Sequence, residues 1–370
     1  MKILFVTDLY PIENEEIARA LFYFVQEWQK QGHEVEVIRA NFIFNTLLRG
    51  RKIIKQKIYQ ENGTKIYNLN FLTPFWFNVY NKLPKDFSLK NYDVIISHMP
   101  CGALMSNKLL KKDKIKYVCA VHASDITVLK DLKYFLFRKG MKKAYLNADK
   151  ISARSPVLQR KIEEVLPEIQ DKTFVAYSGI DDKLIEEHLK PKKFNQEILQ
   201  LSTSASLIKR KNIDIIIKAL SMFSYDFRLT IMGDGREKNK LERLVHKYGL
   251  SKKITFTGKL KRSEVISNLE KSDIFILLSD NETYGLSYLE AMVTGNIVIG
   301  KQNDGIEGLL QNGQNAFLIP ADKFELKKCL DKIYALKETE IEIIKQHSKE
   351  TIEKLSSSKA AENYLKNISI

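Results

Sequence analysis

The sequence contains few cysteines. Its 370 residues include only Cys101, Cys119 and Cys329, which lie far apart and show neither metal-ligand nor redox spacing. A disulfide-stabilised scaffold is therefore not expected, and we expect reduced thiols packed among apolar side chains. This cysteine usage is typical of a cytoplasmic protein.

Long hydrophobic runs are also absent. No uninterrupted apolar stretch reaches the ~20 residues needed to cross a bilayer. The first apolar run is interrupted by Asp8, which leaves it too short for a signal peptide. We expect a soluble, cytoplasmic protein, or one held peripherally at the inner face of the cell membrane.

The first predicted β-α turn has no glycine. The segment 8–15 follows an apolar strand, yet it lacks the glycines that let backbone approach a dinucleotide pyrophosphate. A nicotinamide or flavin site in this unit is therefore unexpected. No P-loop or zinc-ligand spacing occurs elsewhere, so no residue is predicted to bind a metal and no cofactor is expected.

Strand and helix patterns alternate along the whole chain. The predicted strands are 2–7, 35–38, 93–97, 117–121, 198–202, 229–232, 254–256, 274–278 and 297–299, with helical patterns between them. A chain of this length favours roughly two domains. We predict an α/β fold with two doubly wound, Rossmann-like domains, 1–180 and 181–350, facing a central cleft. A polar, proline-marked linker is predicted at 191–196, and a polar C-terminal helix at 351–370 that can pack on either domain, including back on the first.

The most informative segment runs from Glu282 to Glu290. A Gly-Leu-Ser turn separates the two acids, an apolar strand precedes them, and a helical run follows from Glu290. A helix start offers free backbone N–H groups to a phosphate, while carboxylates can accept hydrogen bonds from sugar hydroxyls. Two acids at this spacing also occur by chance on solvated helices, but the turn after a buried strand favours a sugar-nucleotide site.

Three further loops follow predicted strands. Gly233 and Gly235 permit a tight turn near a ligand, although a plain β-α turn explains them equally well. Lys209, Arg210 and Lys211 suit a phosphate, but a solvated basic loop is the more common explanation of such a cluster. His122 ends a strand and can reach a sugar hydroxyl, whereas a lone histidine is more often structural. Each loop supports a ligand-binding site only when it is taken together with the others.

Together these residues resemble the retaining glycosyltransferases of the GT4 family, with the GT-B fold. The E-x7-E signature is matched by 282–290, and the downstream glycine pattern by 295, 304–307 and 312–313. Further matches fall in family order at 32–35, 122–125, 178–181, 233–235 and 254–258. The resemblance covers nearly the whole chain and is specific for the family, but it says little about which sugar is transferred.

The resemblance implies a role for each matched residue. Glu290 would bind the ribose, Glu282 the donor sugar, and Lys211 the diphosphate. Backbone N–H groups of Tyr284, Gly285 and Leu286 would reach the sugar and phosphate, the Thr257–Leu260 segment would border the base, and Gly233 and Gly235 would line the donor site. His122 would reach the donor sugar from the first domain, so His122 and Glu282 are the expected catalytic residues.

The sequence also departs from the family. Many members carry Arg at the position of Ser206, which leaves one phosphate cation missing unless Lys209 or Arg210 replaces it. Members often carry Gly at the positions of Ala18 and Ala123. The resemblance further implies transfer without a metal, with helix dipoles and Lys211 stabilising the departing diphosphate, and same-face attack is the working hypothesis for retention.

Positive charge is concentrated in the first half. Residues 1–180 hold 29 Lys/Arg and 18 Asp/Glu, a net of +11, while the remainder hold 31 and 27, a net of +4, which together give +15. We expect an anionic membrane surface, or a glycan or lipid-linked acceptor, to meet this half at Arg49, Arg51, Lys52, Lys55, Lys57 and Trp76. A similar basic and aromatic stretch covers 130–143. A solvated basic face over core aromatics explains the pattern equally well.

Three alternatives remain open at this point. A sugar-nucleotide epimerase would share the fold but need no acceptor, and a phosphorylase would need pyridoxal phosphate. A nucleic-acid-binding protein would explain the charge, yet no recognition module is present, so no nucleic-acid partner is expected. The favoured function is transfer of a hexose or N-acetylhexosamine from a UDP- or GDP-sugar to a glycan or lipid-linked saccharide in bacterial surface polysaccharide biosynthesis.

Overall fold

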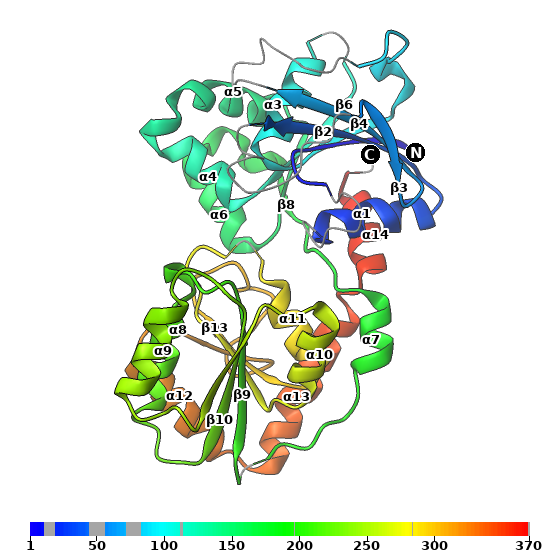
Figure 1. The fold of residues 1–370 in the computed structure, drawn as a ribbon. Helices are drawn as coiled ribbons and strands as arrows, with labels where there is room; N and C mark the ends of the chain where they lie inside the picture. The colour runs from blue at the N-terminus through cyan, green and yellow to red at the C-terminus, as the bar shows by residue number, and fades with distance from the viewer. Residues whose placement is uncertain are drawn as a thin grey trace. The chain divides into compact units, whose positions relative to one another are not determined.

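The computed structural model describes residues 1–10, 19–43, 56–71, 83–111, 114–195, 197–282 and 284–368. The chain forms two compact units (Figure 1). The first comprises Met1–Gly179 together with Ser357–Ile370, and the second comprises Ile180–Ser356. Within the described parts of the chain, no helix is both long enough and apolar enough to cross a bilayer.

The first unit is built on an eight-stranded sheet with the order β3-β4-β2-β1-β5-β6-β7-β8. All its neighbouring strands are parallel except for the antiparallel pair of β3 and β4. The strands are β1 (Lys2–Thr7), β2 (Glu34–Phe42), β3 (Ile58–Glu61), β4 (Thr64–Phe71), β5 (Val94–Ser97), β6 (Lys116–Val121), β7 (Lys150–Ala153) and β8 (Thr173–Val175). The helices are α1 (Arg19–Lys30), α3 (Met99–Leu109), α4 (Ala123–Lys130), α5 (Phe135–Leu146), α6 (Pro156–Val165) and α14 (Ser357–Ile368), with short 3-10 turns at Leu89–Asn91, Leu132–Tyr134 and Pro167–Lys172.

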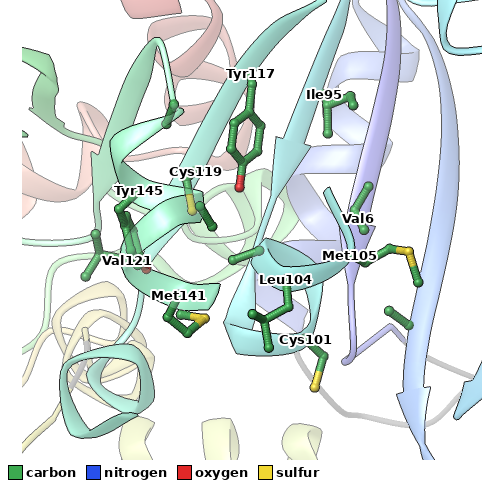
Figure 2. Close-up of a cluster of buried hydrophobic side chains, with 14 of the residues drawn as sticks. Val6, Ile95, Cys101, Leu104, Met105, Tyr117, Cys119, Val121, Met141 and Tyr145 are labelled. Atoms are coloured by element: carbon green, nitrogen blue, oxygen red, sulfur yellow. The ribbon is translucent and has the colours of Figure 1, made fainter. Parts of the chain in front are cut away.

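Helices cover both faces of this sheet, which explains why its strands read as almost continuous apolar runs. On one face, side chains of β1, β5 and β6 pack against α3 and α5, and all of the residues labelled in Figure 2 are buried there. Cys101 and Cys119 belong to this core, and Cys329 is buried in the core of the second unit. Burial raises the pKa of the Cys119 thiol to about 12.

The C-terminal helix α14 packs beside α1 on the opposite face of the first sheet (Figure 1). The indole Nε1 of Trp28 donates to the carbonyl of Ala361 at 3.0 Å, and its ring lies 5.4 Å from that of Tyr364. The Tyr364 hydroxyl lies 2.8 Å from Ser152 Oγ on β7. The end of the chain therefore completes the core of the unit that contains its beginning.

The second unit has a six-stranded sheet with the order β11-β10-β9-β12-β13-β14, all parallel. The strands are β9 (Leu199–Ser204), β10 (Phe227–Met232), β11 (Ile254–Gly258), β12 (Ile274–Leu277), β13 (Ile297–Lys301) and β14 (Phe317–Ile319). The helices are α7 (Asp182–His188), α8 (Ile213–Leu220), α9 (Lys238–Lys247), α10 (Arg262–Glu270), α11 (Leu286–Val293), α12 (Lys323–Tyr334) and α13 (Glu338–Glu353), with a 3-10 turn at Lys209–Lys211. From β9 the chain adds β10 and β11 on one side, and it then adds β12, β13 and β14 on the other. The border between β9 and β12 is therefore a topological switch point, where open α/β sheets bind ligands.

Two local predictions are wrong. The predicted linker at 191–196 belongs to the second unit where it is described, because the Lys192 ammonium donates to the carbonyl of Leu269 at 3.2 Å and the Asn195 N–H to Asp273 Oδ1 at 3.2 Å. The unit boundary falls earlier, between Gly179 and Ile180. The helix after the paired acids begins at Leu286, so Glu290 lies inside α11 rather than at its start.

Candidate active site

The loops that follow β9 and β12 meet at the switch point of the second sheet. Asn212 adopts a left-handed conformation (φ 53°), which asparagine tolerates better than most residues. Its side-chain amide donates to the Leu278 carbonyl at 2.8 Å and to Asp280 Oδ2 at 3.0 Å, and the Asp280 N–H donates to the Arg210 carbonyl at 2.7 Å. These bonds fix the basic loop against the acidic one.

Lys211 and Glu282 form an ion pair at this junction. The Lys211 ammonium donates to Glu282 Oε2 at 2.5 Å, and both side chains are largely buried. The Arg210 guanidinium lies 3.6 Å from the same oxygen, whereas Lys209 is exposed. The structure thus brings Lys211, Arg210 and Glu282 together and leaves Lys209 outside this cluster.

The turn between the two acids requires glycine. Gly285 has φ 81° and is the N-terminal cap of α11, and a Cβ at this position would lie 2.5 Å from the Tyr288 ring. Tyr288 is itself held by a 2.6 Å hydrogen bond from its hydroxyl to the Leu277 carbonyl. Tyr284 is buried beside this turn. The N-terminus of α11, which begins at Leu286, follows Glu282 directly and adds a positive dipole end to the site.

Glu290 pairs with a residue that sequence reasoning missed. Arg262, at the start of α10, donates from Nε to Glu290 Oε1 at 3.0 Å, and its Nη1 lies 3.6 Å from Asp181 Oδ2. The separation of 28 positions gives no local signal. The only available clue was that Arg262 begins a helix after a strand, where side chains reach the ligand edge of a parallel sheet.

Gly233 and Gly235 support the basic loop through close packing. A Cβ on Gly233 would lie 1.9 Å from the Ala205 carbonyl oxygen, and one on Gly235 would lie 2.5 Å from that of Leu207. Leu207 in turn donates its N–H to the Asp234 carbonyl at 2.9 Å. These glycines therefore position the segment that leads to Lys211, and any direct contact with a ligand stays a prediction.

The predicted base-binding residues lie around the end of β11. Thr257 is near the last position of this strand, and its hydroxyl lies 3.0 Å from the Gly258 carbonyl. Leu260 follows and is partly exposed. Both precede α10, which carries Arg262, so they belong to the same carboxyl edge as the acid–cation pairs.

His122 in the first unit is paired with a second histidine. His122 follows β6, His98 follows β5, and His98 Nδ1 lies 3.1 Å from His122 Nε2. Both rings are buried. Burial, with a contribution from the positive charge of Arg154, lowers the pKa of His122 to about 3, and burial with the nearby His122 lowers the pKa of His98 well below its usual value. His98 was missed because 24 residues separate it from its partner.

Asp125 completes this group. One carboxylate oxygen accepts the His122 N–H at 2.7 Å and so caps the first turn of α4. Burial raises the pKa of Asp125 to about 8.

Of the residues predicted to face the acceptor or membrane, Lys57 is exposed just before β3, and Arg49, Arg51, Lys52, Lys55 and Trp76 lie outside the described residues.

Two doubly wound α/β units, the second with acid–cation pairs at the carboxyl edge of its sheet, define a two-domain Rossmann-like architecture. The sequence profile of the glycosyl transferases group 1 matches residues 185–350, and that of Glycosyltransferase Family 4 matches residues 17–184. The chain belongs to this family of glycosyltransferases and has the GT-B fold, which confirms the predicted family, enzyme class and fold.

Relatives support this placement. The chain is 26% identical over 311 residues to N-acetyl-alpha-D-glucosaminyl L-malate synthase of Bacillus anthracis, covering 78% of this chain and 76% of that one. It is 31% identical over 114 residues to alpha-monoglucosyldiacylglycerol synthase of Acholeplasma laidlawii, covering 30% and 29%. Its fold matches that of Anabaena HepE in complex with UDP, with a TM-score of 0.75, 18% identity and 99% of each chain covered.

Proposed function

We propose that this enzyme is a retaining glycosyltransferase that takes a hexose or N-acetylhexosamine from a UDP- or GDP-sugar. The observation that carries the proposal is the pair of acid–cation contacts, Lys211 with Glu282 and Arg262 with Glu290, at one carboxyl edge of the second sheet. A nucleoside diphosphate sugar has the matching chemistry, since it presents a dianionic diphosphate between two sets of hydroxyls. The UDP bound by HepE supports the same class of donor.

The diphosphate would bind at the basic loop. Lys211 and the N-terminus of α11 supply positive charge to a departing phosphate, and Arg210 stands close enough to add a second cation in place of the arginine missing at Ser206. Glu282 holds the Lys211 ammonium in position before the donor arrives. Once the donor is bound, the Glu282 carboxylate would turn to the hydroxyls of the donor sugar.

The nucleoside would bind beside α10 and α11. Glu290 would accept hydrogen bonds from the ribose hydroxyls, and Arg262 holds that carboxylate in place for this task. The Thr257–Leu260 segment would border the base. His122, a neutral donor or acceptor because its pKa is depressed, would contact the donor sugar.

Retention would follow from attack on the same face of the sugar from which the nucleotide departs. The acceptor hydroxyl would form its bond to the anomeric carbon as the bond to the diphosphate oxygen breaks, and its proton would pass to that departing oxygen. Lys211 and the α11 dipole stabilise the negative charge that develops there. Exclusion of water would protect the donor from hydrolysis.

The acceptor would be a glycan or a lipid-linked saccharide, used in building a bacterial surface polysaccharide. The basic first half of the chain supports an acceptor of anionic character, and the partial similarity to a synthase of a glucosylated diacylglycerol supports a lipid component. Peripheral attachment at the inner face of the cell membrane would fit such an acceptor.

A thermal-shift panel of UDP, GDP, ADP and their sugars tests the donor site. A ligand present at about one hundred times its Kd adds about 2.7 kcal/mol to the free energy of unfolding, which raises the Tm by several degrees. One nucleotide should stabilise the native protein, and Glu290→Gln should reduce that shift at the same nucleotide concentration. A panel in which no nucleotide raises the Tm would contradict the proposal.

Two further measurements separate the alternatives. Consumption of the donor without any acceptor, with formation of an isomeric sugar nucleotide, would indicate an epimerase instead. Near-normal turnover of Glu282→Gln would remove this carboxylate from any essential role, including that of a covalent nucleophile.

A further inference from the structure

Helices α4 and α5 follow one another in the first unit (Figure 1), and three exposed apolar side chains, called here the apolar tip, lie at their junction. Leu132, Phe135 and Leu136 are 75%, 64% and 52% exposed and fall within five positions of one another. Among the described residues, Phe324 and Ile343 are comparably exposed, but each stands alone in the sequence. Large apolar side chains gathered in this way mark an interaction site more often than scattered ones do.

The three exposed side chains are not needed to hold α5 in place. The helix already buries Met141, Ala144 and Tyr145 against the core of the first unit. Phe135 and Leu136 lie on the opposite side, at the beginning of the helix, and Leu132 precedes them by one turn. Replacing these three side chains by polar ones would leave the core contacts of α5 intact.

Cations surround the apolar tip. Lys130, Arg138, Lys139, Lys142 and Lys143 are all exposed, and at helical spacing the last three extend the outer face that begins at Phe135. Residues 130–143 contain six Lys or Arg and a single acid, Asp131. Of the cations on α5, Lys142 is engaged by Glu168 at 2.9 Å. The surface therefore joins an apolar tip to a strongly positive face.

We infer that this α4–α5 corner, residues 130–143, docks the enzyme on a bilayer that contains anionic phospholipid. The three apolar side chains would enter the acyl boundary, and the lysines and arginine would lie among the phosphates. A second copy of the chain is a poor occupant, because it would bring an equal positive charge to the same place. This inference deepens the proposed function by assigning the membrane-facing surface to a described element other than the 49–57 segment.

Vesicle flotation tests the inference directly. The full chain is mixed with vesicles of phosphatidylcholine alone, or of phosphatidylcholine with phosphatidylglycerol, and the floated fraction is measured. The expected result is flotation with the anionic vesicles only, weakened by added salt. The triple change Leu132→Ser, Phe135→Ser and Leu136→Ser should lower the floated fraction at least tenfold, as should Arg138→Gln with Lys139→Gln and Lys143→Gln.

The matched control is Phe324→Ser with Ile343→Ser, which removes equally exposed apolar side chains from the second unit and should leave flotation unchanged. Equal flotation of the native chain and the α4–α5 corner variants would overturn the inference. So would flotation with neutral vesicles alone, or light scattering that shows a dimer lost in the triple variant. The nucleotide-dependent Tm shift of each variant reports the donor site separately, so a failure of docking and a failure of the proposed donor chemistry are distinguishable.

Discussion

The Lys211 ammonium lies 2.5 Å from Glu282 Oε2 at the switch point of the second sheet. The two residues come from different loops, 71 positions apart, yet each is the nearest counter-charge of the other. The contact gives each of these largely buried charged groups a partner of opposite charge, without which its burial would be costly. A donor diphosphate bound as proposed would have to draw Lys211 away from Glu282 or share it.

Changing Lys211→Met should lower kcat by ~10²–10³, because it removes the charge proposed to stabilise the departing diphosphate. The Tm should fall as well, since Glu282 then retains only the more distant Arg210. Steady-state kinetics and thermal unfolding measure the two effects. Lys209→Met is the matched control, because Lys209 is exposed only two positions away, and its replacement should leave both quantities nearly unchanged. An unaltered kcat in Lys211→Met would remove this residue from the chemistry.

Arg262→Met should weaken nucleotide binding about as much as Glu290→Gln does, by about 1–3 kcal/mol. Arg262 orients the carboxylate that would hold the ribose, so removing either partner spoils the same contact. The double variant should bind the nucleotide as tightly as whichever single variant binds it less tightly. Isothermal titration of UDP or GDP into each protein gives the coupling free energy between the two residues. Lys261→Met, at the exposed preceding position, serves as the control, and fully additive losses would show that the two residues act independently.

Gly233→Ala should destabilise the second unit by about 3 kcal/mol, because the new Cβ would lie 1.9 Å from the Ala205 carbonyl oxygen. Gly249→Ala is the matched control: it shares a positive φ (68°) but meets nothing within 4 Å, so only backbone strain of about 1 kcal/mol is expected. Urea unfolding of the second unit measures the loss in free energy of unfolding for each of the two variants. Similar losses in both variants would show that close packing at Gly233 is unimportant.

The buried group around His122 should give the first unit a stability maximum near pH 6.5. Folded His98 and His122 have depressed pKa values, so the unfolded chain binds more protons below about pH 6.5 and stability falls toward acid. Folded Asp125 has a pKa of about 8 against 3.8 ordinarily, so the folded chain binds more protons between these values. Asp125 therefore costs about 1–2 kcal/mol of stability as the pH rises from 6.5 to 8.

Asp125→Asn should remove the alkaline part of this dependence while leaving the acid part in place. Thermal unfolding across pH 5–8 measures it, with Asp86→Asn, an exposed change in the same unit, as the control. A Tm that stays level from pH 6.5 to 8 in the native protein would contradict the raised pKa of Asp125.

Much of the fold was predictable from local patterns. The apolar strands and helical spacings recur in sequence order, and the predicted strand 2–7 coincides with β1. Glu282 and Glu290 were found for the same reason, because the strand, the turn and the helix around them follow one another directly in the sequence. The start of α11 was misplaced by four residues, since Leu286 and Ser287 carry no strong cap signal and only the left-handed Gly285 marks the boundary.

The sequence by itself determined the alternation of strands and helices, the glycine turn between Glu282 and Glu290, and the family. Only the tertiary structure decided which charges meet: Arg262 with Glu290, Lys211 with Glu282, and His98 with His122. These partners come from separate loops that converge because parallel strands bring all their carboxyl ends to one edge. That convergence depends on the order of strands in the sheet, which arises from long-range pairing and is not written in any local segment.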